Sequence, residues 1–215
     1  MRWMQRIGFQ SMKSIKWLAT IPPYLAIGAG IYAFKNAWIT LIGYHLTLLL
    51  ILSLARPAIR FKILLQTRSL AWIRRSLFAS AGIGITIFFL HPYLGFVDDY
   101  SSRLEALGLN PSTWPAFLTY ITLTNPFLEE FFWRAHLGSE APTLHFTDVL
   151  YAGYHGLVLV LFVQPWMVLL SLAVLTLSGW LWRRIYRMEG GLLVPVAGHM
   201  AADFFILLAV CLISG

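Results

Sequence analysis

Long apolar runs dominate this sequence, and polar residues interrupt them at intervals instead of alternating with them. Seven runs have the character of membrane-crossing helices, at residues 17–34, 38–54, 76–91, 114–137, 147–163, 166–182 and 192–213. A straight membrane helix needs about 20 residues, so several of these runs are short. A transmembrane β-barrel would show short alternating strands. The pattern predicts an all-α transmembrane helical bundle of about seven spans.

The composition supports a membrane as the solvent of this bundle. Of 215 residues, 59% are hydrophobic and 12% are charged, and the mean hydropathy is +0.71. Soluble domains carry about 25% charged residues. A soluble chain of this length could not bury so much apolar surface. We therefore expect a multi-pass integral protein of the cell membrane, folded as one membrane-embedded domain over residues 1–215, with lipid as a partner.

Basic residues are distributed unevenly between the predicted loops. If the N-terminus is cytoplasmic, all of the 16 Lys and Arg residues except Lys35 and Arg103 lie on the cytoplasmic side. This is the distribution that sets orientation in membrane proteins. It predicts a cytoplasmic N-terminus and an external C-terminus. It also accounts for the net charge of +7, so no nucleic-acid partner is expected.

Two basic segments lie outside the spans. Residues 1–16 are cationic and amphipathic, which is typical of a helix on the membrane surface, of a charged flank of the first span, or of a signal peptide. Residues 56–75 contain six basic and no acidic residues. We expect an interfacial helix there, and recruitment of anionic lipid or an acidic partner is the alternative. The single cysteine, Cys211, excludes an intramolecular disulfide.

Three charged residues lie inside the apolar run 114–137, namely Glu129, Glu130 and Arg134. A charge near the bilayer centre costs about 3 kcal/mol on insertion scales, so such residues are usually functional. Glu130 and Arg134 are spaced i,i+4 and can pair on one helix face. Pro126 removes a helical hydrogen bond and is expected to bend the helix just before the glutamates.

Two further spans carry polar residues at a similar depth. His155 lies about eight residues inside the run 147–163, and His199 lies about seven residues inside the run 192–213, which is roughly 10–12 Å at helical rise. Asp203 follows His199 at i,i+4. The two glutamates lie roughly 8–12 Å from the cytoplasmic end of their own span. This agreement in depth predicts one shared site in the cytoplasmic half of the membrane.

Each of these residues also has an ordinary structural interpretation. Glu130 and Arg134 can form a purely structural ion pair, and a single buried histidine is more often a hydrogen-bonding residue than a catalyst. Tyr151 is expected to pack. The other histidines have no partner at the same depth and are expected to be interfacial or incidental: His45, His91, His136 and His145.

Small residues on two of these spans suggest a close helix contact. Gly153 and Gly156 lie on the run 147–163, and Gly198 and Ala202 lie on the run 192–213. Small residues let membrane helices approach closely. We therefore expect these two runs to pack directly against each other.

The polar residues resemble the motifs of the CAAX protease and bacteriocin-processing (CPBP, or Abi) family, which are EExxxR, FxxxH and HxxxN/D. The matching positions are Glu129, Glu130 and Arg134, then Tyr151 and His155, then His199 and Asp203. The resemblance covers residues 114–213, which it identifies as the catalytic core.

The resemblance implies an intramembrane endopeptidase of the glutamate type, without cofactor or metal. Its substrate would be a prenylated or otherwise processed peptide or protein, reached from the cytoplasm or the membrane. Glu129 would be the general base that activates water, and His155 would help to hold that water. Glu130 and Arg134 would fix the geometry of their helix.

By the same resemblance, His199 and the Asp203 position would stabilise the oxyanion of the tetrahedral intermediate. Two residues depart from the family pattern. Tyr151 replaces the usual Phe, and Asp203 replaces Asn. An ionised Asp cannot donate to an oxyanion, so either Asp203 is protonated or His199 alone donates.

Three alternatives stay open at this point. Two histidines and a glutamate also suit a zinc hydrolase, although no HExxH is present. A catalytically silent member would use the same cluster as a membrane scaffold or bacteriocin-immunity protein. Buried carboxylates also occur in proton-coupled transporters, but no inverted repeat is evident. The sequence predicts neither the substrate nor the oligomeric state.

Overall fold

The computed structural model describes residues 16–57 and 59–215. The predicted interfacial segment 1–16 lies outside the described residues except for Lys16. In the described part of the chain the fold is all-α, as predicted, with a single isolated β-bridge between Phe96 and Val163. Its α-helices are α2 (Ile21–Gly28), α3 (Ala37–Ala55), α4 (Leu70–Leu90), α5 (Tyr100–Ala106), α6 (Trp114–Glu129), α7 (Phe146–Leu159), α8 (Pro165–Glu189) and α9 (Leu193–Ser214). Shorter 3-10 or π segments are η1 (Lys16–Thr20), η2 (Ala29–Ala33), η3 (Phe61–Leu65), η4 (His91–Tyr93) and η5 (Glu130–His136).

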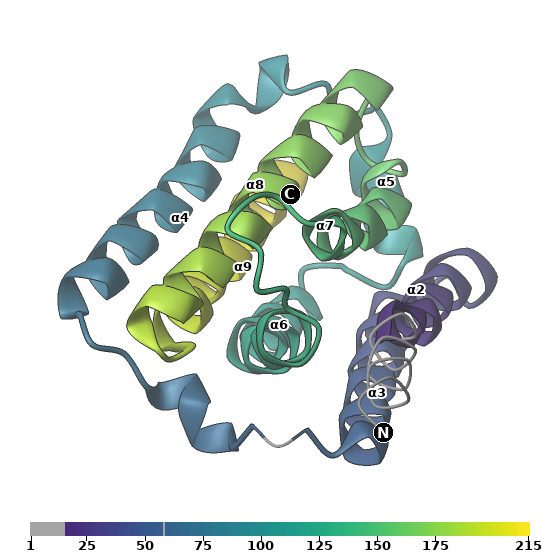
Figure 1. Cartoon of the computed structure of the whole chain (residues 1–215). Helices are drawn as coiled ribbons and strands as arrows, with labels where there is room; N and C mark the ends of the chain where they lie inside the picture. The colour runs from purple at the N-terminus through teal and green to yellow at the C-terminus, as the bar shows by residue number, and fades with distance from the viewer. Residues whose placement is uncertain (1–15, 58) are drawn as a thin grey trace, which may run out of the picture.

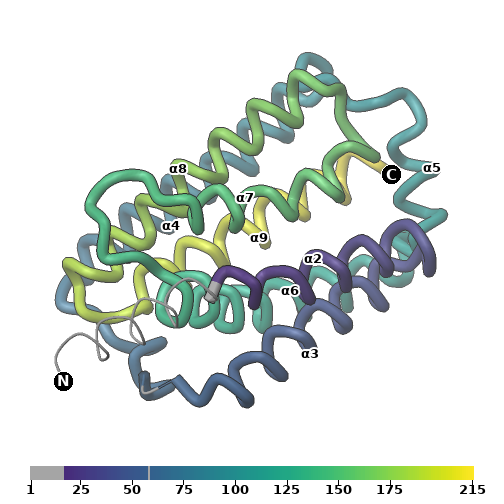
Figure 2. The backbone as a smooth tube through the Cα atoms, turned by 45° about the vertical axis from the view of Figure 1, so that its right-hand side comes forward, coloured from purple at the N-terminus to yellow at the C-terminus, as the bar shows by residue number. Residues whose placement is uncertain are grey.

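Helix α6 lies in the middle of the bundle, and its C-terminal end is buried. In Figure 1 it lies between α3 on one side and α9 on the other, and it contacts both. Helix α4 packs along α9, and α7 packs against α8. Figure 2 shows the long helices running side by side along the length of the molecule. This arrangement places the polar stretch of α6 and η5 away from the outer surface.

Within residues 16–57 and 59–215, four helical segments are long and apolar enough to cross a membrane, which is the character expected of a multi-pass membrane protein. They are Ala37–Ala55, Leu70–Tyr93, Pro165–Glu189 and Leu193–Ser214. The other three predicted spans, 17–34, 114–137 and 147–163, are also largely helical, but each is broken or short. The seven-span count stays a prediction.

Backbone contacts join different loop segments at the two ends of the bundle. At one end, the turn between α8 and α9 meets the basic segment 56–75, where Leu192 N–H donates to the Ile63 carbonyl at 2.8 Å. At the other end, next to Lys35 and Arg103, Ala37 N–H donates to the Leu107 carbonyl at 2.9 Å. The orientation of these ends in a membrane stays a prediction.

Two expectations about packing and local structure are wrong. Segment 56–75 is not one helix, because η3 is a short 3-10 turn and α4 already begins at Leu70. The glycines do not bring α7 and α9 together. A Cβ added at Gly198 would overlap Ser76 Oγ of α4, while Gly153 faces the Tyr24 hydroxyl of α2 and Gly156 faces Leu172 of α8. The small residues therefore serve three different helix contacts.

Candidate active site

The polar stretch of the interior helix changes from an α-helix to a π-helix at Glu130. Helix α6 ends at Glu129, and η5 continues the same chain to His136. Pro126, which cannot donate a helical hydrogen bond, lies one turn earlier. π-helical turns are rare and occur often at functional sites. Glu129 and Glu130 are only 1% and 0% exposed, so both carboxyl groups point into the bundle.

Glu130 connects two of the predicted site residues. Its Oε2 accepts a hydrogen bond from Arg134 Nε at 3.1 Å, and its Oε1 lies 2.9 Å from His199 Nδ1. The predicted i,i+4 pair is therefore confirmed. The Arg134 guanidinium lies 3.9 Å from the centre of the Tyr151 ring. Tyr151 is thus a buried packing partner of the arginine, as expected.

Glu129 has two inequivalent carboxylate oxygens. The Tyr154 hydroxyl donates a hydrogen bond to Oε1. The other oxygen, Oε2, is buried and accepts no hydrogen bond from the part of the chain that the structure describes. This oxygen lies 3.7 Å from His199 Nε2. Buried polar atoms without a partner are rare and suggest a functional role.

The His199 imidazole is surrounded by carboxylates and fixed by an aromatic ring. Its Nδ1 faces Glu130, and its Nε2 lies 3.4 Å from Asp203 Oδ1. The ring stacks on Trp182, with 5.1 Å between ring centres. Because Nδ1 is bound by Glu130, Nε2 is the nitrogen that can face a substrate.

His155 joins the cluster through a neighbouring ring. Its Nδ1 lies 3.2 Å from the Tyr151 carbonyl oxygen, one helical turn earlier on α7. The imidazole stacks on Tyr154, with 4.0 Å between ring centres. Since Tyr154 binds Glu129, all six predicted residues lie in one connected cluster.

Several residues of this cluster were missed by the sequence analysis. Asn125 Nδ2 donates to Asp203 Oδ2 at 3.0 Å, and Asn125 Oδ1 lies 3.1 Å from His45 Nε2. The expectation that His45 is incidental is therefore wrong, because its side chain is 2% exposed and reaches the site. Tyr154 was also missed. The available signal was a polar residue inside an apolar run, and the comparison of depths included only the two glutamates, His155, His199 and Asp203.

A second buried ion pair holds the loop before α7. Arg183 of α8 donates to both Asp148 oxygens, at 2.9 and 2.7 Å, and also to the carbonyls of Ser139, Ala141 and Thr143. From the sequence, Arg183 is predicted only to lie among the cytoplasmic basic residues. His145 is not incidental, since its side chain accepts a hydrogen bond from Thr147 N–H and caps α7.

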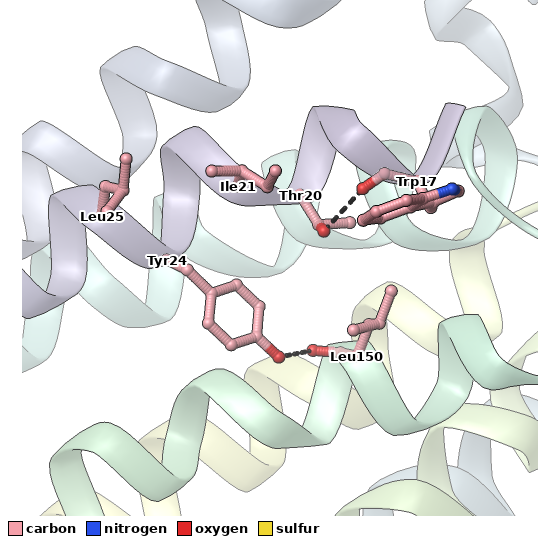
Figure 3. A pocket seen from close by; sticks show the side chains of 6 residues that line it. All are labelled: Trp17, Thr20, Ile21, Tyr24, Leu25 and Leu150. Atoms are coloured by element: carbon pink, nitrogen blue, oxygen red, sulfur yellow. Dashed lines mark hydrogen bonds between the residues drawn. The ribbon is translucent and has the colours of Figure 1, made fainter. Parts of the chain in front are cut away.

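An apolar pocket lies beside the cluster, between the start of α2 and α7 (Figure 3). Its lining residues are Trp17, Thr20, Ile21, Tyr24, Leu25 and Leu150. The Tyr24 hydroxyl points across it to the Leu150 carbonyl, to which it donates at 2.6 Å. The Tyr24 ring also meets the Tyr154 ring edge-on at 6.3 Å. The pocket lining itself contains no charged group.

The arrangement suits hydrolysis by an activated water. Glu129 Oε2, which accepts no hydrogen bond from the described residues, faces an imidazole nitrogen, as a general base and an electrophilic partner require. Within residues 16–57 and 59–215, no group of three or more His, Cys, Asp or Glu side chains has the geometry of a metal site.

Residues 111–205 match the family model described as type II CAAX prenyl endopeptidase Rce1-like. The matched interval contains all six predicted site residues. No curated protein and no solved structure matches the chain. The match shows that this chain carries, in residues 111–205, a domain of the Rce1-like type II CAAX prenyl endopeptidase family, which is a peptidase family.

Proposed function

We propose that this protein is an intramembrane endopeptidase in which Glu129 activates the attacking water. The observation that carries the proposal is the inequivalence of the two Glu129 oxygens. Tyr154 holds Oε1 and so fixes the carboxylate. Oε2 is left to accept a proton, 3.7 Å from His199 Nε2. A water between these atoms would have both a base and a hydrogen-bonding imidazole.

The reaction then follows in two steps. Glu129 Oε2 takes a proton from water while the water oxygen bonds to the carbonyl carbon of the scissile peptide, and the C=O electron pair moves to the oxygen. The tetrahedral intermediate collapses, the C–N bond breaks, and the leaving nitrogen takes the proton from Glu129. The products are a new carboxyl group and a new amine. General bases contribute typically about 10²- to 10⁴-fold to such rates.

The remaining residues position the reacting groups. Arg134 holds Glu130, and Glu130 holds Nδ1 of His199, so Nε2 is aimed at the water and the carbonyl oxygen. In its protonated form, His199 donates from Nε2 to the developing oxyanion. His155, whose Nδ1 is engaged by the Tyr151 carbonyl, keeps Nε2 to contact the water. As a carboxylate, Asp203 is an acceptor and not an oxyanion donor.

The proposed substrate is a membrane-associated peptide or protein, prenylated or otherwise processed. The cluster is built from α6, η5, α7 and α9, and its glutamates are buried inside the bundle, so a substrate would reach it from within the membrane or from the end that carries the basic residues. Proteins of the matched family are named for prenylated CAAX substrates. A farnesylated CAAX peptide is therefore the first substrate to test.

The decisive experiment compares cells that carry the wild-type protein with cells that carry Glu129→Gln. Quantitative peptide analysis should show one or more precursors that accumulate only with the variant, and their uncleaved bonds would define the specificity. Glu105→Gln makes the same chemical change at an exposed position of α5 and should leave the peptides unchanged. Turnover by purified, folded Glu129→Gln would contradict the proposal.

The same variant separates the alternatives. A scaffold or immunity function would survive Glu129→Gln, because the substitution keeps the size of the side chain. A zinc-dependent variant of the reaction would lose activity after chelation and regain it with zinc, whereas the proposed mechanism predicts full activity of the chelator-washed enzyme.

A further inference from the structure

A hydrogen-bonded chain of four side chains leads into the site from α3 and α6. The Tyr120 hydroxyl lies 3.1 Å from His45 Nδ1, and His45 Nε2 lies 3.1 Å from Asn125 Oδ1. Asn125 Nδ2 in turn lies 3.0 Å from Asp203 Oδ2 and 3.5 Å from His199 Nε2. His45 and Asn125 are 2% and 6% exposed. Buried polar networks of this kind are costly unless every member is satisfied.

The direction of each hydrogen bond in this chain follows from its last member. A carboxylate can only accept, so the amide nitrogen of Asn125 must face Asp203, and Oδ1 must face His45. Oδ1 can only accept, so His45 Nε2 must carry a proton. A neutral imidazole then has an acceptor at Nδ1, to which the Tyr120 hydroxyl donates. One assignment of protons thus satisfies all four residues.

This assignment leaves one amide hydrogen of Asn125 near the reacting atoms. Asp203 takes one of the two N–H groups, and the amide nitrogen lies close to the imidazole nitrogen that faces Glu129 Oε2. Three groups surround His199 Nε2: Glu129 Oε2, Asp203 Oδ1 and Asn125 Nδ2. Of these three, only the amide is a donor while the acids are ionised.

We propose that Asn125 donates a hydrogen bond to the carbonyl oxygen of the scissile peptide, with His45 as the positioning residue that fixes the orientation of the Asn125 amide. The inference rests on the proposed function and adds two residues outside the three sequence motifs. It also assigns Asp203 a task that a carboxylate can perform, which is to orient the Asn125 amide.

The test measures cleavage of a quenched fluorescent farnesylated CAAX peptide by the purified full-length protein. Asn125→Ala should lower kcat about 100- to 1000-fold with little change in KM, the usual effect of removing one oxyanion donor. Asp203→Asn restores an amide beside the site, so the Asn125→Ala/Asp203→Asn double variant should recover at least about tenfold of that loss. Recovery distinguishes a lost donor from lost packing, and its absence in a folded double variant would overturn the donor role.

His45 is tested by a pair of variants. His45→Gln keeps a nitrogen donor near the position of Nε2 and should retain most of kcat, whereas His45→Phe should lower kcat at unchanged KM. Thr47→Val is the matched control on α3, because the Thr47 hydroxyl donates to the Tyr44 carbonyl on the same helix. Equal activity of the Gln and Phe variants would contradict the positioning role.

A measurement without substrate tests the proton assignment directly. In the histidine-labelled protein in micelles, ¹⁵N NMR should show His45 as the neutral form protonated at Nε2, and Asn125→Ala should shift this signal. His45 protonated at Nδ1 alone would overturn the assignment. Glu129→Gln is assayed in parallel: if it stays active, the proposed function fails, whereas wild-type kcat in Asn125→Ala beside an inactive Glu129→Gln defeats only the role of Asn125.

Discussion

Glu130 Oε1 and His199 Nδ1 are joined by a hydrogen bond of 2.9 Å between residues that are 69 positions apart. Both side chains are almost fully buried. The bond fixes which imidazole nitrogen faces Glu129, and Arg134 fixes the Glu130 carboxylate from the other side. Every role proposed for this site depends on this arrangement.

Removal of the Arg134 charge should destabilise the protein strongly. Arg134→Met leaves the buried Glu130 carboxylate without its guanidinium, and breaking a buried ion pair costs about 3–5 kcal/mol. Thermal unfolding in detergent should show a large decrease in Tm. The Glu130→Gln/Arg134→Met double variant removes both charges and should unfold at a higher temperature than Arg134→Met alone. The opposite order of the two Tm values would show that the unpaired Glu130 charge is not the main cause of the lost stability.

Tyr154→Phe should lower activity without disrupting the fold. The substitution removes the donor to Glu129 Oε1 and leaves that oxygen unsatisfied in a buried position. We expect kcat to decrease about tenfold, which corresponds to about 1.4 kcal/mol. Tyr32→Phe is the matched control. The Tyr32 hydroxyl also donates to α7, the helix that carries Tyr154, but its acceptor is the Leu157 carbonyl and not a carboxylate. If both variants lose activity equally, the hydrogen bond to Glu129 has no specific role.

Gly198→Ala should separate α4 from α9. An added Cβ would overlap Ser76 Oγ and lie 3.3 Å from Trp182 Nε1. Overpacking of this kind costs about 1–3 kcal/mol, and it would also disturb the ring on which His199 stacks. Ser76→Gly removes the overlapping atoms, so the Ser76→Gly/Gly198→Ala double variant should regain part of the lost Tm. A double variant that is no more stable than Gly198→Ala would locate the strain elsewhere.

Acid should weaken the N-terminal cap of α7. Burial, and then the Arg183 guanidinium, lower the pKa of His145 from its usual 6.5, although Asp148 opposes this shift. A lowered pKa means that the unfolded chain binds the proton more readily than the folded protein does. The contribution of neutral His145 to the stability of the fold is therefore present above about pH 6.5 and is lost as pH falls through the folded-state pKa. Protonated His145 cannot accept from Thr147 N–H. A lost cap costs about 1 kcal/mol.

His145→Asn provides the comparison for this pH dependence. Asn is a good N-cap that does not titrate in this range. The Tm of the wild-type protein should therefore decrease more between about pH 7.5 and pH 5 than the Tm of the variant. Parallel curves for the two proteins would show that His145 does not contribute to the acid sensitivity.

The class of the protein and most of its candidate site could be predicted from residue order alone. Apolar runs of membrane length can only satisfy their backbone as helices, and the structure is all-α. Charges are expensive in such runs, so Glu129, Glu130 and Arg134 stood out against their surroundings. The common depth of His155, His199 and Asp203 then predicted a shared site, because rise along a helix depends on residue number alone.

Which side chains face one another across helices could not be predicted in this way, because it depends on how the helices pack in three dimensions. Residue number gives the depth of His45, Asn125 and Tyr154, but their rotation toward the site depends on how α3, α6 and α7 pack and on the π-helical turn at Glu130. The same reason explains the failed expectation that Gly153, Gly156 and Gly198 join α7 to α9. A small residue permits a close approach, and the partner helix is chosen by the packing of the whole bundle.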